Sequence, residues 1–235
     1  MNIPETFSIR SISYDDCKEW CLYKHYAHRM PPISFAFGLY RDMVLEGICT
    51  FGRPVALQLV KFAFKGEYQE QFYELNRLCV NEGLPKNVLS YFVSQCLKAL
   101  PKPMVIVSYA DSSQNHHGYI YQATNWLYTG LSVPFQDYMV KGFEHMHPAS
   151  VMDMVGRSDN NGHIDKVRLL KEKFGEENVY MVERPRKHRY FMLLGSATEK
   201  KRMRSLLAYD IVPYPKGDNQ RYDASYQCEP QGCLF

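Results

Sequence analysis

The chain has 235 residues and is 46% hydrophobic and 23% charged, the composition of a globular protein with a substantial core. Its formal net charge of +3 does not mark a strongly basic nucleic-acid-binding protein, and no apolar run is long enough to cross a membrane. The first ten residues lack the basic and apolar regions of a secretory signal, so we expect a cytoplasmic protein.

The first third of the chain predicts a strand, a helix and a β-hairpin. Residues 7–13 predict the strand, and Asp15 and Asp16 then open a helix that runs to about residue 25, because acidic side chains suit the first turn of a helix. Residues 33–40 and 44–51 predict the two strands of the hairpin. A loop with a short helix is expected to follow.

The stretch of residues 72–129 predicts a strand, a polar loop, a helix, a second strand and a second helix. Apolar and polar residues alternate over residues 73–79, which is the period of a half-buried strand. Residues 81–87 (NEGLPKN) contain Gly and Pro and predict a turn before the helix. The second strand, residues 104–109, delivers Asp111 to a loop.

This order of elements predicts an α/β fold, with a mixed central sheet flanked by helices. It is also the order of the GNAT acyltransferase fold, so we expect a GNAT-like catalytic core over residues 1–140. The Gly-rich phosphate loop typical of that fold is replaced here by residues 81–87.

Three residues near the start of the helix after residue 87 are candidates for binding an anionic donor. The free N–H groups of a helix N-terminus, together with Lys86, suit a phosphate, and Asn87 and Ser90 lie beside them. Solvent-facing side chains are the alternative for Lys86 and Ser90.

Arg77 is a fourth candidate for donor binding. Strand alternation predicts that it faces the same side as Tyr73 and Leu75, where a buried charge needs a partner. That partner is either a donor phosphate or Glu74.

Five blocks of sequence, in order, resemble the Mom family of phage DNA adenine-modification proteins: HYAHRMPPISFAFGLY, VLEGICTFGRP, YELNRLCVNEGLPKNVLSYFV, VSYADSSQNHHGYIYQATNWLYTG and PRKHRY. The resemblance implies a GNAT-like fold and a transferase that converts adenine in DNA to N6-carbamoylmethyladenine, protecting phage DNA from host restriction. It also implies action in the host cytoplasm on double-stranded DNA, with a small-molecule donor.

The exocyclic amine of adenine is a weak nucleophile that needs a base or a metal-bound group to take its proton. The resemblance ties the His25–Tyr26 pair and the block ending in Asp111 to activity. We expect Asp111 to act as base, His25 as base or metal ligand, Tyr26 as proton donor or substrate contact, and Tyr121 as general acid. The alternatives are a turn cap for Asp111, a surface group for His25 and a core aromatic for Tyr121.

The donor and the metal stay open at this point. Attaching a carbamoylmethyl group is an alkylation and not a plain acyl transfer, so a simple acetyl-CoA mechanism does not yield this product without a further nitrogen source or a rearrangement. An acyl-CoA and a glycine-derived species both stay open as the donor. The resemblance links the family to iron, and His25 with Asp111 supplies part of a site of the 2-His-1-carboxylate type. The oligomeric state, with a homodimer among the options, is equally open.

Basic residues concentrate in the C-terminal third, where we expect contacts with DNA phosphates. The candidates are Arg186, Lys187, His188, Arg189, Lys200, Lys201 and Arg202. Residues 141–235 are therefore expected to form a basic C-terminal extension that completes the core and contacts DNA, within one compact domain. A solvated helix face is the alternative for the second group, on a predicted helix over residues 197–208. A flipped adenine is expected to stack on Trp126 or Tyr128.

The sequence thus predicts a DNA adenine-modifying transferase. The first alternative is an acyl-CoA-dependent GNAT N-acyltransferase that acts on a protein or a small-molecule amine. The second is a DNA-binding protein without catalytic activity.

Overall fold

The computed structural model of the protein describes residues 2–112, 116–146, 148–156 and 165–217. The chain forms two compact units, a main unit (Met1–Leu131 with Lys187–Phe235) and a small unit (Ser132–Arg186). The expected division of the chain at residue 140 stays a prediction. Within the described residues, every helix falls short of the length and apolarity that crossing a membrane requires.

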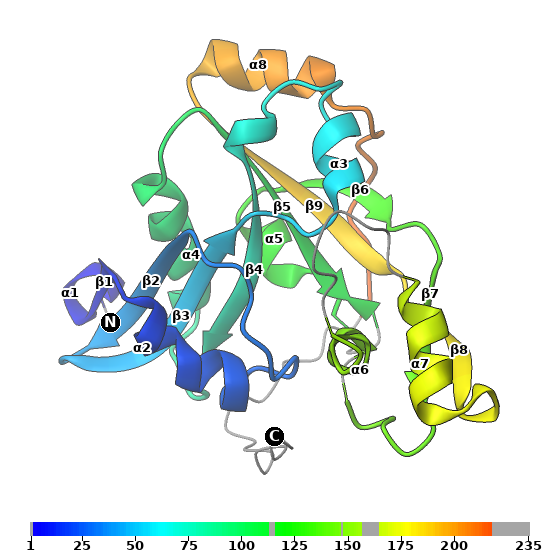
Figure 1. Cartoon of the computed structure of the whole chain (residues 1–235). Helices are drawn as coiled ribbons and strands as arrows, with labels where there is room; N and C mark the ends of the chain where they lie inside the picture. The colour runs from blue at the N-terminus through cyan, green and yellow to red at the C-terminus, as the bar shows by residue number, and fades with distance from the viewer. Residues whose placement is uncertain (1, 113–115, 147, 157–164, 218–235) are drawn as a thin grey trace. The chain divides into compact units, whose positions relative to one another are not determined.

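The main unit is built on one mixed sheet of seven strands, in the order β1-β2-β3-β4-β5-β9-β6 (Figure 1). The strands are β1 (Phe7–Ser11), β2 (Phe35–Arg41), β3 (Val44–Gly52), β4 (Phe72–Val80), β5 (Met104–Asp111), β6 (Leu127–Leu131) and β9 (Lys187–Leu194). Only β4 and β5 pair in parallel; the other neighbouring strands of this sheet are antiparallel.

Helices cover both faces of this sheet. They are α1 (Ile3–Thr6), α2 (Tyr14–Glu19), the π-helix η1 (Trp20–Lys24), α3 (Leu57–Phe62), the 3-10 helix η2 (Gln69–Gln71), α4 (Val88–Ala99), α5 (Tyr119–Ala123) and α8 (Ala197–Leu206). Successive side chains of β5 point to opposite faces of the sheet, because a strand is pleated. Ile106 packs into the buried cluster that contains α4 and α5 residues, whereas Val105 and Val107 pack with residues of α3 and α8.

The predicted order of elements and the mixed α/β sheet are confirmed. The predicted helix near residue 15 begins where expected, because Ser13 and Asp16 form a reciprocal capping box. It differs in its second half, which is the π-helix η1, so that His25 at its end leaves the helix in an extended conformation.

A β-bulge in β4 decides which way Arg77 points. β3 and β4 pair Phe51 with Leu75 but Thr50 with Arg77, so Asn76 is an extra residue on β4. One extra residue moves the following side chains to the other face of the sheet. Leu75 accordingly packs in the cluster under α4, whereas Arg77 shares the opposite face with Thr50. The prediction that Arg77 and Leu75 face the same side was wrong, because simple alternation cannot anticipate the bulge.

The small unit is a two-stranded sheet with helices. It contains β7 (Phe135–Val140), α6 (Pro148–Asp153), α7 (Lys166–Phe174), the 3-10 helix η4 (Glu176–Asn178) and β8 (Val179–Arg184). Met139, Val140, Val151 and Leu170 form its buried centre. An ion pair between Arg184 and Asp137 joins the two antiparallel strands near the end at which Phe135 pairs with Arg184.

Candidate active site

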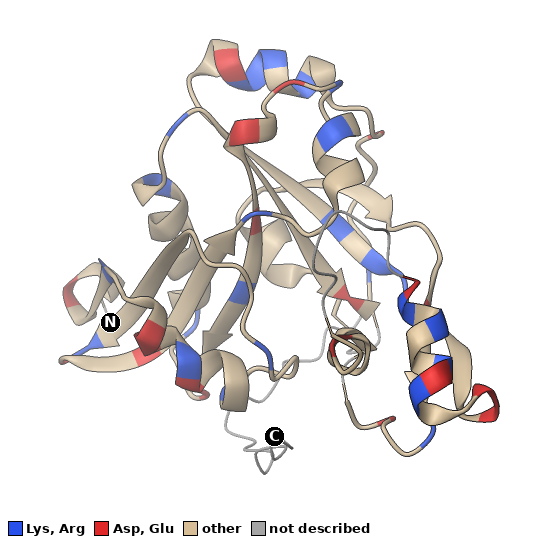
Figure 2. Cartoon of the chain, in the orientation of Figure 1, with Lys and Arg blue, Asp and Glu red and all other residues tan. Residues whose placement is uncertain are grey.

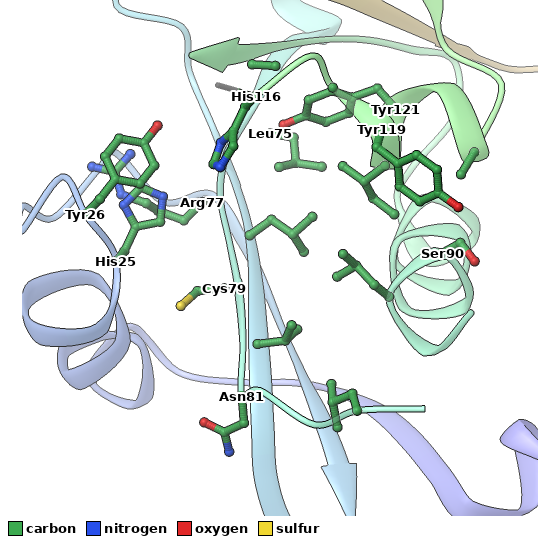
Figure 3. Close-up of a pocket in the computed structure, with 18 of the residues that line it drawn as sticks. His25, Tyr26, Leu75, Arg77, Cys79, Asn81, Ser90, His116, Tyr119 and Tyr121 are labelled. Atoms are coloured by element: carbon green, nitrogen blue, oxygen red, sulfur yellow. The ribbon is translucent and has the colours of Figure 1, made fainter. Parts of the chain in front are cut away.

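A cleft of about 380 Å³ in the main unit gathers most of the predicted site residues. Its lining includes His25, Tyr26, Arg77, Lys86, Asn87, Ser90, Tyr121 and Lys187, all of which the sequence pointed to. It also includes Glu74, Asn81, Tyr109 and His116. Figure 3 shows His25, Tyr26 and His116 gathered on one side of the view, and Tyr119, Tyr121 and Ser90 on the other.

The cleft opens where the two parallel strands stop pairing. Phe72–Glu74 pair with Val105–Val107, and beyond that point both strands contribute lining residues, Leu75–Val80 from β4 and Tyr109 with Ala110 from β5. Where the pairing of the two strands stops, a side chain takes over a hydrogen bond to the backbone. Ser108 Oγ donates a hydrogen bond to the Leu75 carbonyl (2.8 Å), which satisfies a buried acceptor that the parallel ladder leaves.

The N-terminal end of α4 lies at this cleft, as expected for an anion site. Asn87 has a left-handed backbone (φ 70°) and its side chain makes no cap hydrogen bond to the helix. Ser90 Oγ instead donates to the Asn87 carbonyl (3.0 Å). The preceding loop is anchored to β3, because Asn81 Nδ2 donates to Glu46 Oε2 (2.8 Å). Lys86 is exposed at the rim, and the helix end presents partial positive charge to the cleft.

The bulged segment of β4 holds the loop that follows His25. Asn76 Nδ2 donates to the Pro32 carbonyl (2.7 Å), and Arg77 Nη2 donates to the Arg29 carbonyl (2.8 Å). Arg77 Nε is buried and has no hydrogen-bond partner among the described residues. Asn76, the extra residue of the bulge, and its neighbour Arg77 therefore both hold this loop at the wall of the cleft.

His25 is a buried, neutral imidazole in this structure. Burial, and then the positive charge of Arg77, hold the pKa of its ring well below the usual value of 6.5. Its Nδ1 accepts a hydrogen bond from the Ala27 N–H (3.1 Å), so the proton of the neutral ring belongs on Nε2. The Tyr26 ring stacks on it, with centroids 4.3 Å apart. In this state His25 offers a donor to its surroundings, which suits positioning better than proton abstraction.

Tyr121 lines the cleft from α5 and is mostly buried. Its hydroxyl lies 2.7 Å from Ser108 Oγ, and burial raises the pKa of the phenol well above its usual value. A phenol that stays protonated is suited to donate a proton to a leaving group. The expected role of Tyr121 as general acid stays a prediction, and the core-aromatic alternative also holds in part, because the ring packs against Trp126 and Tyr190.

Asp111 is the last residue of β5, and its carboxylate forms an ion pair with Lys187 (2.9 Å). Lys187 lines the cleft, whereas the Asp111 side chain is not part of the lining. The Asp111 carbonyl accepts a hydrogen bond from the His116 N–H (3.2 Å), so the backbone of Asp111 also helps to hold His116 at the cleft. Its predicted role as base stays a prediction.

The part of the chain that the structure describes brings no three His, Cys, Asp or Glu side chains together in a position to hold a metal ion. The acceptor role of His25 Nδ1 also places the ring proton on Nε2, the nitrogen that a ligand to iron would need to offer. The described residues therefore do not fit the expected iron site, and no step below is assigned to a metal.

Glu74 is the site residue that sequence reasoning missed, although the sequence carried a signal. It stands between Tyr73 and Leu75 on a half-buried strand, where an acidic side chain needs a reason to be buried. Burial raises the pKa of its carboxyl to about 7, against the opposing effect of the Arg77 and Lys187 charges. The same argument that singled out Arg77 applies to Glu74.

This shift predicts a pH-dependent effect of Glu74→Gln on stability. Between pH 4.5, the usual pKa, and about 7, the unfolded chain loses the Glu74 proton while the folded chain keeps it. Folding stability therefore falls as pH rises through this window. Relative to the parent, the Gln variant should gain roughly 1–3 kcal/mol in unfolding free energy between about pH 5 and about pH 8. Urea unfolding of both proteins at the two pH values checks this, and an equal difference at both would contradict it.

The first basic group is not the exposed surface that the sequence predicted. Lys187, His188 and Arg189 lie within β9, and only Lys187 reaches the cleft. His188 is 9% exposed, with Nδ1 2.7 Å from the Tyr128 hydroxyl; Arg189 is 8% exposed and donates from Nε to Thr129 Oγ1 (2.9 Å). Their burial in the sheet excludes these two from phosphate contact in this structure.

The second basic group lies at the other end of the sheet from the cleft. Lys187 pairs with Asp111 at the cleft end of β9, whereas Leu194, which precedes α8, pairs with Met104 at the opposite end. Eight strand residues span roughly 25 Å. Figure 2 shows blue (Lys, Arg) segments on the helix at that far end, which is α8 in Figure 1. Lys200, Lys201 and Arg202 belong to this helix. Arg202 is paired with Glu67 (2.7 Å).

The expectation for a flipped adenine needs a similar correction. Trp126 is 0% exposed and Tyr128 is 7% exposed, so neither offers a free ring face on which a flipped adenine stacks. Arg186 is exposed in the small unit and donates from Nε to the Ser132 carbonyl (2.6 Å), and its contact with DNA stays a prediction. Among the aromatic residues that the sequence predicted for the site (Tyr26, Tyr121, Trp126 and Tyr128), Tyr26 is partly exposed and lines the cleft.

Comparison with known proteins identifies the family. The model of the Mom protein family matches residues 6–216. The chain belongs to the Mom protein family. Within it, the chain is similar to the Methylcarbamoylase mom of Escherichia phage Mu, with 25% identity over 201 residues, 82% of this chain and 77% of that protein.

The Mom family chain also has distant likenesses among solved structures. An N-acetyltransferase from Staphylococcus aureus Mu50 matches with a TM-score of 0.41 and 11% identity, over 80% of this chain and 99% of that one. A GNAT family acetyltransferase from Elizabethkingia anophelis with acetyl-CoA bound matches with a TM-score of 0.38 and 12% identity, over 81% and 99%. The assignment to the α/β class rests on the strand order described above.

Proposed function

We propose that this protein is a transferase that modifies adenine in DNA at the N6 amine, adding a carbamoylmethyl group that protects the DNA from restriction. Family membership supports the reaction class, since the relative from phage Mu is a methylcarbamoylase by name. The observation that carries the proposal is that one cleft is lined by the predicted donor-binding residues and by most of the predicted catalytic residues, His25, Tyr26 and Tyr121.

The cleft has two chemically distinct sides, which suits two substrates. At the α4 end, Lys86, Asn87 and Ser90 offer a cation and a helix N-terminus to an anionic donor, either an acyl-CoA or a glycine-derived species. At the other side, His25, Tyr26 and His116 offer ring faces and hydrogen-bonding nitrogens to a flat acceptor. When bound, the donor supplies the electrophilic carbon. The residues of the cleft orient the donor and transfer protons.

The proposed reaction proceeds when the N6 nitrogen attacks the donor carbon. Arg77, beside the cleft, stabilises negative charge that develops there, and Tyr121 donates a proton toward the leaving group. Lys187, held by Asp111, adds a second cation at the acceptor side.

Lys200, Lys201 and Arg202 remain proposed contacts with the DNA backbone. At roughly 25 Å from the cleft, they would meet phosphates about seven base pairs from the modified adenine.

Mass spectrometry of nucleosides tests this function directly. The wild-type chain and the Asp111→Ala variant are expressed in a bacterium, and plasmid DNA is digested and measured. We expect a heavier deoxyadenosine with the wild type, and at least about tenfold less with Asp111→Ala, because Lys187 loses its partner. Asp15→Ala, which breaks the exposed Asp15–Lys18 pair, serves as the matched control and should leave the modification unchanged.

The outcomes separate the alternatives. Unmodified DNA with the wild type would contradict the proposal and favour an acyl-CoA-dependent N-acyltransferase with another amine acceptor, an activity that the GNAT-like strand order also suits. Tight DNA binding without any modified nucleoside would favour the DNA-binding protein without catalytic activity.

A further inference from the structure

The cleft contains two acidic side chains, Glu74 and Glu82, and they differ in their surroundings. Glu82 is exposed on the loop after β4, whereas Glu74 is largely buried at the point where β4 and β5 separate. No hydrogen bond or ion pair joins the Glu74 carboxylate to another residue within the described ranges. Burying a carboxylate without a hydrogen-bond or ion-pair partner lowers the stability of the fold. Such a residue in a cleft is therefore a candidate for a functional role.

The surroundings of Glu74 suit proton transfer. Arg77 and Lys187 act on it with positive charge and favour the carboxylate, and the phenols of Tyr109 and Tyr121 lie within electrostatic reach. Asp111, the other acidic candidate, is engaged with Lys187 and does not line the cleft. His25 accepts a backbone hydrogen bond at Nδ1 and carries its proton on Nε2. Among the acidic side chains of the described cleft, Glu74 is therefore the one that is largely buried and has no hydrogen-bond or ion-pair partner.

We propose that Glu74 is the catalytic base of this enzyme, and that its carboxylate removes the proton of the adenine N6 amine; this rests on the proposed function. A bond forms between N6 and the donor carbon, and the bond between that carbon and its leaving group breaks with its electron pair. The N6 proton passes to a Glu74 oxygen. A raised pKa near neutrality matches this task, because the group is ionised often enough to accept a proton and basic enough to hold it.

Nucleoside mass spectrometry of plasmid DNA from cells that express each variant tests this role. Glu74→Gln keeps the size of the side chain but removes the proton acceptor, and we expect modified deoxyadenosine to fall by at least about 100-fold. Glu74→Asp keeps a carboxylate one methylene further back, so we expect a partial loss of about tenfold. Glu70→Gln is the matched control, because Glu70 is exposed, lies outside the cleft and pairs with Arg53 at the surface; this variant should match the wild type.

Two further measurements keep the result interpretable. The purified Gln variant should bind duplex DNA with a Kd within about twofold of the wild type, which separates chemistry from binding. If the Gln variant is insoluble, Glu74→Leu replaces it, because an apolar side chain suits the buried position and also lacks a proton acceptor.

Each outcome bears on one proposal or on both. Modification by Glu74→Gln within about threefold of the wild type would overturn the assignment of Glu74 while the proposed function stands. Unmodified DNA with the wild type itself would overturn the proposed function and this inference together. Loss with Glu74→Gln, partial retention with Glu74→Asp and no change with Glu70→Gln would support the assignment.

Discussion

Replacing Arg77 with alanine is expected to lower adenine modification by about 100-fold, which corresponds to about 2.7 kcal/mol of activation free energy. The guanidinium donates to the Arg29 and Asn76 carbonyls, and its buried Nε has no partner among the described residues. The variant therefore loses a cation at the cleft and a tie to the loop after His25. Mass spectrometry of plasmid nucleosides measures the effect.

Arg77→Lys separates charge from geometry. A lysine keeps the positive charge but cannot donate to two carbonyls in the planar arrangement of a guanidinium, so we expect most of the activity to be lost in this variant too. Arg53→Ala is the matched control, because Arg53 also donates to two backbone carbonyls, those of Gln69 and Phe72, but lies outside the cleft. Wild-type modification by Arg77→Ala would contradict any role for this side chain in the site.

Gly52→Ala is expected to be the most destabilising small substitution in the main unit, with a loss of about 3 kcal/mol or more in unfolding free energy. A Cβ at this position would lie 1.8 Å from the Pro32 carbonyl oxygen, which is backbone and cannot rotate away. The loop that carries His25 and Tyr26 ends at this contact. The fraction of the variant that still folds should therefore also modify DNA poorly. Urea unfolding followed by circular dichroism measures the change.

Gly83→Ala provides the comparison for this prediction. Gly83 has φ +75°, where an added Cβ costs about 1 kcal/mol, but no atom lies within 4 Å of that Cβ. We therefore expect Gly52→Ala to be clearly worse than Gly83→Ala. Equal losses would mean that the loop at Pro32 yields easily and does not brace the site.

The sequence predicted the local features of the site well. Turn residues before Val88, breakers after Ala99 and the alternation that starts β4 all act over a few residues, so pattern alone located these elements. Because β4, β5 and α4 are consecutive, their local order also placed Lys86, Asn87 and Ser90 near one another, and all three line the cleft.

The properties that the sequence could not supply arise from contacts between distant segments. Glu74 and Arg77 are separated by the Asn76 bulge, which exists because β3 pairs with β4 in one register. His188 and Arg189 look like part of a basic run, but antiparallel pairing with β5 and β6 buries them in the sheet. Leu194, which precedes α8, pairs with Met104 at the end of β5 opposite the cleft. This pairing places the start of α8 away from the cleft.

The sequence by itself determined the order of strands and helices, the α/β class and the family, together with the main residues of the cleft. Those properties depend on neighbours along the chain or on long matched blocks. Only the tertiary structure decided which face Arg77 takes, which acid is left unpaired and which cations are exposed. Burial and strand register depend on residues far apart in sequence, and a shift of one residue in register reverses the face of every side chain that follows.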